Sequence, residues 1–201
     1  MDHVNTPDHC LTFHKNIEME SFNIIKVNSS ESNSLLTLSW KTFYESFNHL
    51  NTPENMAVYM NKAFTSDKLL SELFNPFSEF YFIKEGSIIM GYLKINRGGA
   101  QTDVMGDSSL EIERIYIDQD YQGRGIGAKL LEKAKERARE LELEYVWLGV
   151  WEKNTDAIRF YQRHGFEIYS SHPFIFGDEV QTDLLMRCYL PLERKTGPGI
   201  L

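Results

Sequence analysis

Residues 109–166 decide the fold, and they read SLEIERIYIDQDYQGRGIGAKLLEKAKERARELELEYVWLGVWEKNTDAIRFYQRHGF. Apolar content predicts a strand from about Leu110 to Ile117, and apolar residues at helical spacing predict a helix from about Gly125 to Leu141. A second strand (Tyr145–Trp151) and a second helix (Asn154–His164) follow. Preceded by antiparallel strand patterns, this order is typical of a mixed α/β sheet.

The segment between the first strand and the first helix is Gln122-Gly123-Arg124-Gly125-Ile126-Gly127. Glycines let consecutive backbone N–H groups converge on one anion, and the first helical turn adds unpaired donors and the positive end of the helix dipole. Arg124 can add a charged contact. The segment therefore predicts a pyrophosphate site, although three glycines are also compatible with a tight turn alone.

The same glycines fit the dinucleotide pattern GxGxx, followed here by Ala128, and Glu152 ends the next strand. In a dinucleotide fold the strand leads directly into the first glycine, whereas residues 118–122 intervene here. After the second strand only about 50 residues remain, which is too few for a doubly wound sheet. The dinucleotide interpretation is therefore rejected.

The first strand changes phase along its length. Between Leu110 and Ile117, apolar residues first occupy even positions and then odd ones. Because a regular strand keeps one face, a switch near 113–114 predicts a β-bulge, unless the strand is buried on both faces. A bulge frees a backbone N–H, which could bind a carbonyl oxygen on which negative charge develops.

Glu111 and Glu113 stand just before this switch. Either could be a general base for an ammonium group, directly or through water, if a partly apolar cleft raises its pKa. They could instead bind a cationic substrate without taking its proton, or lie on a solvated strand face. The residues alone leave these three roles open.

The second helix carries polar groups on one face. Asn154 is a good N-cap residue, and Asn154, Ala157 and Tyr161 fall on the same helical face. A tyrosine, with a pKa near ~10, can protonate a departing thiolate. Beside Phe160, Tyr161 is also compatible with a core position.

The remaining elements are read from the same kinds of pattern. Further strands are predicted at 22–27, 80–83, 88–95, 166–170 and 184–190. Further helices are predicted up to Phe47 with a cap at Ser30 or Ser32, from Pro53 to about Phe64, and from Ser66 to Phe74.

The chain has 201 residues, 42% hydrophobic and 25% charged, which indicates one globular domain with a real core. The expected boundaries are an extension over residues 1–18, a single domain over 19–192 and a tail over 193–201. The net charge of -8 argues against nucleic-acid or anionic-membrane partners and is compatible with a cationic small molecule.

The expected localisation and cysteine chemistry follow from sequence features that we do not find. No apolar run is long enough for a membrane helix, and the first residues lack a signal-peptide core. Cys10 and Cys188 form no CxxC pair, which predicts neither a disulfide framework nor a zinc site. A cytosolic protein without a metal is expected.

Taken together, the two motifs resemble those of the GNAT superfamily of acyl-CoA N-acyltransferases. Gln122–Gly127 resembles its Q/R-x-x-G-x-G/A signature, and Asn154–Phe166 is similar to its second hallmark, N-x-x-A-x-x-F-Y-x-x-x-G-F. The resemblance covers about residues 20–190. It implies about seven strands in a mixed, mostly antiparallel twisted sheet with a bulged fourth strand, flanking helices, and acetyl-CoA between splayed fourth and fifth strands.

The resemblance also assigns roles by position, with acetyl-CoA as co-substrate and no metal. The implied coenzyme contacts are Ile115, Tyr116, Ile117, Gln122, Gly123, Arg124, Gly125, Ile126, Gly127, Ala128, Asn154, Ala157 and Tyr161. Tyr161 would be the acid that reprotonates coenzyme A. Glu111 and Glu113 stand where members of the superfamily place a catalytic base.

Three segments, 109–117, 147–154 and 177–184, look closer to PaiA-type bacterial polyamine acetyltransferases, which acetylate spermidine and spermine. This implies direct transfer to a primary amine, with an aromatic and acidic acceptor groove. Its implied members are Trp40, Phe43, Tyr44, Glu45, Asp178, Glu179 and Asp183. The alternatives are a protein or peptide N-acetyltransferase and a non-catalytic acyl-CoA-binding regulator. Because the superfamily often dimerises, a homodimer is a further expectation.

Overall fold

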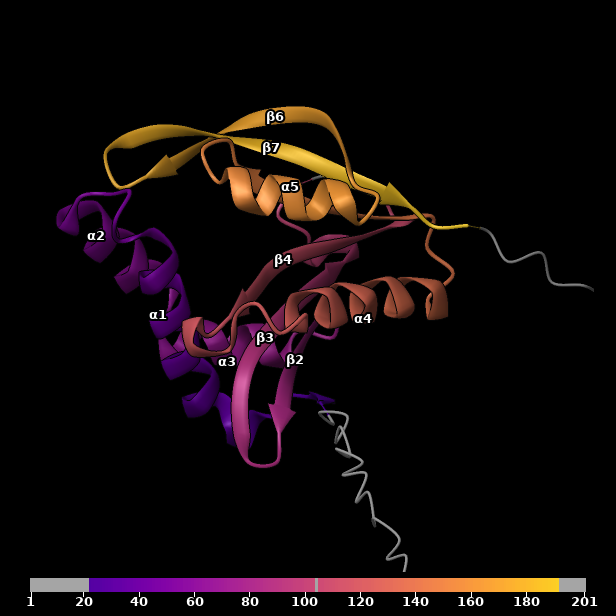
Figure 1. Cartoon of the computed structure of the whole chain (residues 1–201), viewed down its shortest axis with the longest axis horizontal. Helices are drawn as coiled ribbons and strands as arrows, with labels where there is room; N and C mark the ends of the chain where they lie inside the picture. Colours follow the sequence, from indigo (N-terminus) through magenta and orange to yellow (C-terminus); the bar gives the residue numbers. More distant parts are fainter. Residues whose placement is uncertain (1–21, 104, 192–201) are drawn as a thin grey trace, which may run out of the picture.

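The computed structural model describes residues 22–103 and 105–191 (Figure 1). The predicted extension over 1–18, the tail over 193–201 and Cys10 lie outside the described residues. Within the described ranges, no helix combines the length and apolar content needed to cross a membrane.

One seven-stranded sheet organises the described chain, in the order β1-β2-β3-β4-β5-β7-β6. All neighbouring strands are antiparallel except β4 and β5, which are parallel. The strands are β1 (Asn23–Lys26), β2 (Ser78–Glu85), β3 (Ile88–Arg97), β4 (Ser109–Ile117), β5 (Tyr145–Trp151), β6 (Glu167–Phe176) and β7 (Glu179–Tyr189). The expected mixed, mostly antiparallel sheet is confirmed.

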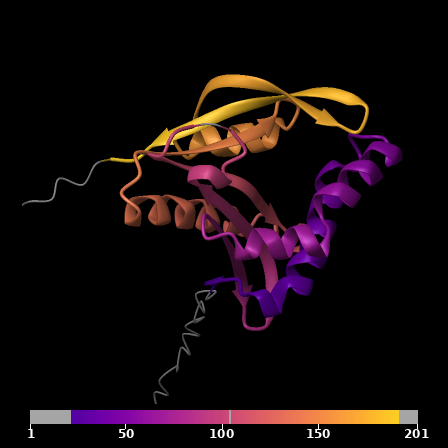
Figure 2. The same cartoon turned by 180° about the vertical axis from the view of Figure 1, so that it is seen from behind.

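In the described part of the chain, five α-helices flank this sheet: α1 (Ser32–Phe47), α2 (Pro53–Ala63), α3 (Ser66–Phe74), α4 (Ile126–Glu140) and α5 (Thr155–Arg163). Figures 1 and 2 show α4 and α5 on one face, while α1 and α3 pack on the other. Alternate residues of β2 explain the two layers. Tyr81 and Ile83 join the cluster around α4, whereas Phe80 and Phe82 pack with Leu35 and other residues of the opposite layer.

The predicted bulge is confirmed in β4. Arg114 pairs with Lys94 of β3 and Ile112 with Ile95, so Glu113 has no cross-strand partner of its own. The extra residue restores one apolar face, because Ile112 and Ile115 both pack against the α4 cluster although their numbers differ in parity.

Two predicted details differ from the structure. Asn28, rather than Ser30 or Ser32, caps the chain before α1: its side chain accepts from the Ser30 N–H at 3.0 Å and opens a short 3-10 turn. The last two strands are also much longer than expected, because β6 and β7 continue to a turn at Gly177. Near this turn, apolar residues occupy both faces of the hairpin, with Phe176 buried and Ile175 and Val180 exposed, so no apolar alternation marks the strands.

Candidate active site

A cavity opens where β4 and β5 separate. The two strands pair only from Ser109↔Tyr145 to Glu111↔Trp147, and the bulge at Glu113 then bends β4 away. The space has a volume of about 1220 Å³ and is lined from both faces of the sheet, including α1, α2, α5 and the turn before α4. A splayed parallel pair therefore provides a passage through the sheet.

The turn into α4 lies at one side of this cavity. Gly123 and Gly125 have φ values of 78° and 73°, a left-handed conformation that favours glycine. Both line the cavity, and the N-terminus of a 15-residue helix follows them. Helix N-terminal N–H groups and the helix dipole attract anions, so this wall fits a pyrophosphate.

Arg124 is the one predicted coenzyme contact that does not line the cavity. Its guanidinium lies 3.2 Å from Glu85 and stacks over the rings of Phe22 and Tyr121. The lining residues among those predictions are Ile115, Tyr116, Ile117, Gln122, Gly123, Gly125, Ile126, Gly127, Ala128, Asn154, Ala157 and Tyr161.

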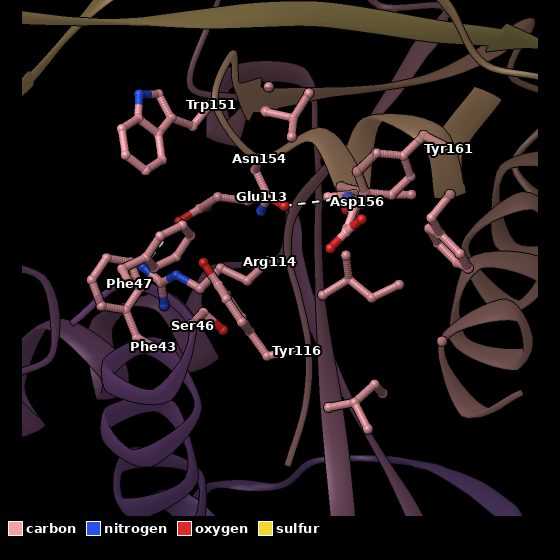
Figure 3. Close-up of a pocket in the computed structure, with 18 of the residues that line it drawn as sticks. Phe43, Ser46, Phe47, Glu113, Arg114, Tyr116, Trp151, Asn154, Asp156 and Tyr161 are labelled. Carbon is pink, nitrogen blue, oxygen red and sulfur yellow. Dashed lines mark hydrogen bonds and ion pairs between the residues drawn. The ribbon is translucent and has the colours of Figure 1, made fainter. Parts of the chain in front are cut away.

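Helix α5 presents the predicted polar face to the same cavity. Oδ1 of Asn154 accepts from the Ala157 N–H at 3.2 Å, which fixes the first turn. Tyr161 is buried, and desolvation raises the pKa of its phenol well above the ordinary value, so it keeps its proton. Figure 3 shows Tyr161 on α5, across the cavity from the residues of α1.

Glu111 of β4 lines the cavity and is buried. Burial raises the pKa of its carboxyl group, while hydrogen bonds from Thr102 and Asn96 oppose that shift. Oε2 accepts from the Thr102 N–H and from Nδ2 of Asn96, both at 2.9 Å, and Oε1 accepts from the Thr102 hydroxyl. Its carboxylate therefore already has three donors.

Glu113 belongs to a buried ion network. Its oxygens contact Nζ of Lys94 and, at 2.9 Å, a guanidinium nitrogen of Arg114. Glu72 of α3 bonds the same two cations at 3.0 Å. Burial opposes ionisation of Glu113, but Arg114, Lys94 and Asn96 outweigh it and lower the pKa of this carboxyl. Glu113, the residue at the bulge, is therefore ionised and held in place by these two cations.

Aromatic rings form the wall opposite α5, and the sequence motifs did not identify most of them. Phe43 and Phe47 of α1 lie 4.7 Å apart between ring centroids, and Tyr59 of α2 stacks on Phe43 at 4.9 Å. Phe176 of β6 and Trp151 of β5 extend this wall. Figure 3 shows Glu113, Arg114 and Tyr116 pointing from β4 towards it. Helices α1 and α2 and strand β6 lie outside the two sequence motifs, so only the aromatic content of these segments indicates that they could line the site.

Of the predicted acceptor residues, Phe43 and Asp183 line the cavity. Trp40 donates its indole N–H to the Phe64 carbonyl at 2.9 Å, and Glu45 accepts from the Gln119 N–H at 3.3 Å. Tyr44 is 54% exposed. Asp178 and Glu179 lie at the turn between β6 and β7.

Sequence reasoning missed a histidine of the cavity wall. His172 of β6 pairs in register with Asp183 of β7, so both side chains share one face of the hairpin. Nδ1 of His172 lies 2.9 Å from Oδ2 of Asp103, and Nε2 lies 4.0 Å from Oδ2 of Asp183. Burial raises the pKa of Asp183, and His172 opposes that shift. Among the described residues, no three His, Cys, Asp or Glu side chains are grouped to hold a metal ion.

Comparisons with known proteins agree with this geometry. The model of the acetyltransferase (GNAT) family matches residues 33–166. An uncharacterised N-acetyltransferase encoded in the pepI 3′ region of Lactobacillus delbrueckii subsp. lactis is 39% identical over 169 residues, which are 84% of this chain and 98% of that protein. The spermine/spermidine N(1)-acetyltransferase of Bacillus subtilis (strain 168) is 40% identical over 57 residues, 28% of this chain and 38% of that protein.

Solved structures show the same fold at lower identity. PaiA N-acetyltransferase from Thermoplasma acidophilum, in complex with coenzyme A, superposes with a TM-score of 0.70 at 18% identity, over 85% of this chain and 99% of that one. The ribosomal-protein-S18-alanine N-acetyltransferase of Escherichia coli gives 0.66 at 13% identity, over 89% and 100%. With a family model spanning the splayed strands and both helices of the site, the chain belongs to the acetyltransferase (GNAT) family and is an N-acetyltransferase that uses acetyl-CoA.

Proposed function

We propose that the acetyl acceptor is a primary amine of a small polycation, with a polyamine such as spermidine or spermine as the first candidate. The observation that carries this proposal is the charge on the acceptor side of the cavity. Lys94 and Arg114 are balanced there by Glu72 and Glu113. Asp183 lines the cavity together with the aromatic rings, and among the described residues His172 is the one basic side chain recorded within 4.0 Å of its carboxylate.

Both kinds of group suit an ammonium ion. A half-buried carboxylate attracts the positive charge, and aromatic faces attract a cation within about 6 Å of the ring centroid. Phe47 lies 6.4 Å from both Trp151 and Tyr116, so several rings border one space. The partial identity to a spermine/spermidine acetyltransferase supports the same acceptor class.

The coenzyme side would work mainly through backbone groups. The turn before α4 would hold the pyrophosphate, and residues 115–117 beyond the bulge would meet the pantetheine and thioester. Tyr161, which burial keeps protonated, would give its proton to the departing thiolate. Holding both reactants in one cavity would supply much of the rate acceleration. The cytosolic location and the homodimer expected from the sequence stay predictions.

A coupled assay of thiol release tests the acceptor. The protein with acetyl-CoA is given spermidine, spermine, propylamine or a peptide with a free N-terminus and a lysine. We expect the largest kcat/KM for the polyamines, and a KM for spermidine that rises with ionic strength because salt screens the ammonium groups.

Three results would contradict the proposal. Equal kcat/KM for propylamine and spermidine would show that the additional charges are not recognised. A peptide acetylated faster than either polyamine would assign the cavity to a protein acceptor. Tight acetyl-CoA binding without turnover of any amine would indicate a regulator.

A further inference from the structure

His172, Asp103 and Asp183 form a cluster on the acceptor side of the cavity, and the family motifs do not include them. They come from three segments: the loop after β3, the edge strand β6 and its neighbour β7. His172 and Asp183 line the cavity. Each of the three side chains is partly exposed, at 33%, 33% and 19% for His172, Asp103 and Asp183, so solvent can exchange protons with the cluster.

The contact with Asp103 orients the imidazole. With Nδ1 2.9 Å from a carboxylate oxygen, the proton of the neutral ring is favoured on Nδ1. Nε2 then carries the lone pair on the side of Asp183, from which it is 4.0 Å away. This is the arrangement of a base held by one carboxylate and placed beside a second one that can attract an ammonium ion.

Glu111 supports the cluster through the loop after β3. It accepts from both the backbone N–H and the hydroxyl of Thr102, the residue before Asp103. Gln101 of the same loop also bonds the Trp147 indole N–H and the Ser109 hydroxyl. The hydrogen bonds of Gln101 and Thr102 therefore hold the loop in the position from which Asp103 contacts His172.

The two glutamates are less suited to accept the proton. Glu113 is held by Lys94 and Arg114, which favour its ionised form and make it a weak base. Glu111 already accepts from three donors. By contrast, Asp103 holds Nδ1 of His172, Nε2 lies on the side of Asp183, and histidine is the side chain that most often serves as a general base in enzymes.

We infer that His172 is the general base of the acetyl transfer, that Asp103 is its positioning residue, and that Asp183 holds the ammonium ion beside it. This rests on the proposed amine acceptor. The ammonium gives one proton to Nε2 of His172, and the amine nitrogen attacks the thioester carbonyl. The new C–N bond forms and the C–S bond breaks. Tyr161 gives its proton to the thiolate, the second proton of the nitrogen passes through solvent to the Tyr161 phenolate, and His172 releases its proton to solvent.

The test compares His172→Gln with the wild type over pH 6–10, using spermidine or whichever amine of the panel the wild type acetylates. Base catalysis typically contributes about 10²–10⁴-fold, so we expect kcat/KM near pH 7 to fall at least ~100-fold. Without the base, only the free amine reacts, and its fraction grows about tenfold per pH unit below an amine pKa of roughly 10. The variant should therefore approach the wild type at high pH.

Three further measurements separate catalysis from structure. Exogenous imidazole should restore part of the activity of His172→Ala. Asp103→Asn should lower kcat and move the acid limb of the wild-type profile to lower pH, because the imidazolium loses its counter-charge. Acetyl-CoA affinity should be unchanged in all three variants. His49→Gln is the matched control, since His49 is exposed and lies outside the cavity.

Several outcomes would overturn the inference. Wild-type kcat/KM in His172→Gln would do so, and so would a loss confined to KM. If Glu111→Gln shows the pH-dependent defect and His172→Gln does not, the glutamate is the base. If spermidine fails but another amine is acetylated, the polyamine proposal fails while His172 is still tested with that amine. If no amine is acetylated, there is no proton to remove and His172 has no such role.

Discussion

The two sides of the cavity are built in different ways. The side that we propose for the coenzyme uses residues 115–117 of β4 and two short stretches, 122–128 and 154–161, whose backbone N–H groups and one helical face would supply most of the contacts. The side that we propose for the acceptor combines side chains of α1, α2, β4, β5, β6 and β7. Backbone groups of short local segments can bind a ligand that a whole family shares. An acceptor is selected by side chains from distant segments, which only the fold brings together.

The two sides also differ in electrostatics. The coenzyme side uses a helix N-terminus and glycines, which need no buried charge. The acceptor side holds Lys94, Glu113 and Arg114 in a buried network with Glu72. Removing one member of such a network leaves its partners unpaired. Substitutions on the acceptor side should therefore affect stability as well as specificity.

The largest expected effect is that of Arg114→Met. It leaves Glu72 and Glu113 with Lys94 as their one remaining partner of this network, and breaking a buried ion group typically costs about 3–5 kcal/mol. Urea unfolding at pH 7 measures the change in the free energy of unfolding. Arg139→Met is the control, because its exposed pair with Glu132 should contribute at most about 1 kcal/mol. If both variants lost the same free energy of unfolding, the buried network would be no more stabilising than an exposed ion pair, and the electrostatic difference between the two sides would not hold.

Tyr161→Phe probes the coenzyme side. Loss of the acid should lower kcat about 10²-fold, while the Kd for acetyl-CoA changes by less than about twofold because the ring still packs. Steady-state kinetics and calorimetry measure the two quantities. Tyr44→Phe, at an exposed position on α1, should leave both unchanged. An unchanged kcat in Tyr161→Phe would refute its role as the acid.

Glu79→Gln tests whether α4 is held by an ion pair remote from the cavity. Burial opposes ionisation of Glu79, but hydrogen bonds from Arg137 and Tyr81 lower its pKa to about 2. The variant should lose about 1–3 kcal/mol at pH 7. Because the folded pKa lies below the ordinary value of 4.5, this contribution is full above pH 4.5 and is lost as the pH falls towards 2.

Unfolding curves at pH 7 and pH 3 measure this effect, and the difference between wild type and Glu79→Gln should shrink at the lower pH. Glu140→Gln is the matched control, because Glu140 bonds the same Arg137 at 2.9 Å from an exposed position. Its effect should stay below about 1 kcal/mol. A change of kcat in Glu79→Gln would show that the ion pair also shapes the cavity.

The smallest expected effect separates two of the predicted acidic residues. Asp183→Asn should raise the KM for spermidine about tenfold, because the cavity loses a carboxylate that faces the ammonium ion. Asp178→Asn, at the turn between β6 and β7, should leave KM unchanged. Initial rates at low ionic strength measure both. Equal effects would indicate that overall charge rather than the cavity wall recognises the amine.

Local patterns were sufficient for much of the fold and of the coenzyme side. The spacing around β5 and α3 predicted both elements with the bounds that the structure shows, and the phase change near Glu113 predicted the bulge. The β6–β7 hairpin was underestimated, because apolar residues occupy both of its faces near the turn, with Phe176 buried and Ile175 and Val180 exposed. A strand whose exposed face is also apolar lacks the alternation that predicts a half-buried strand.

The sequence by itself determined the nature of the coenzyme wall, because turn conformation, helix capping and helical faces depend on neighbours within a few residues. Only the tertiary structure decided which side chains form the acceptor wall. It directed Arg124 towards Glu85, Tyr44 to the surface and His172 into the cavity. These positions depend on contacts between distant segments, and no spacing along the chain encodes them.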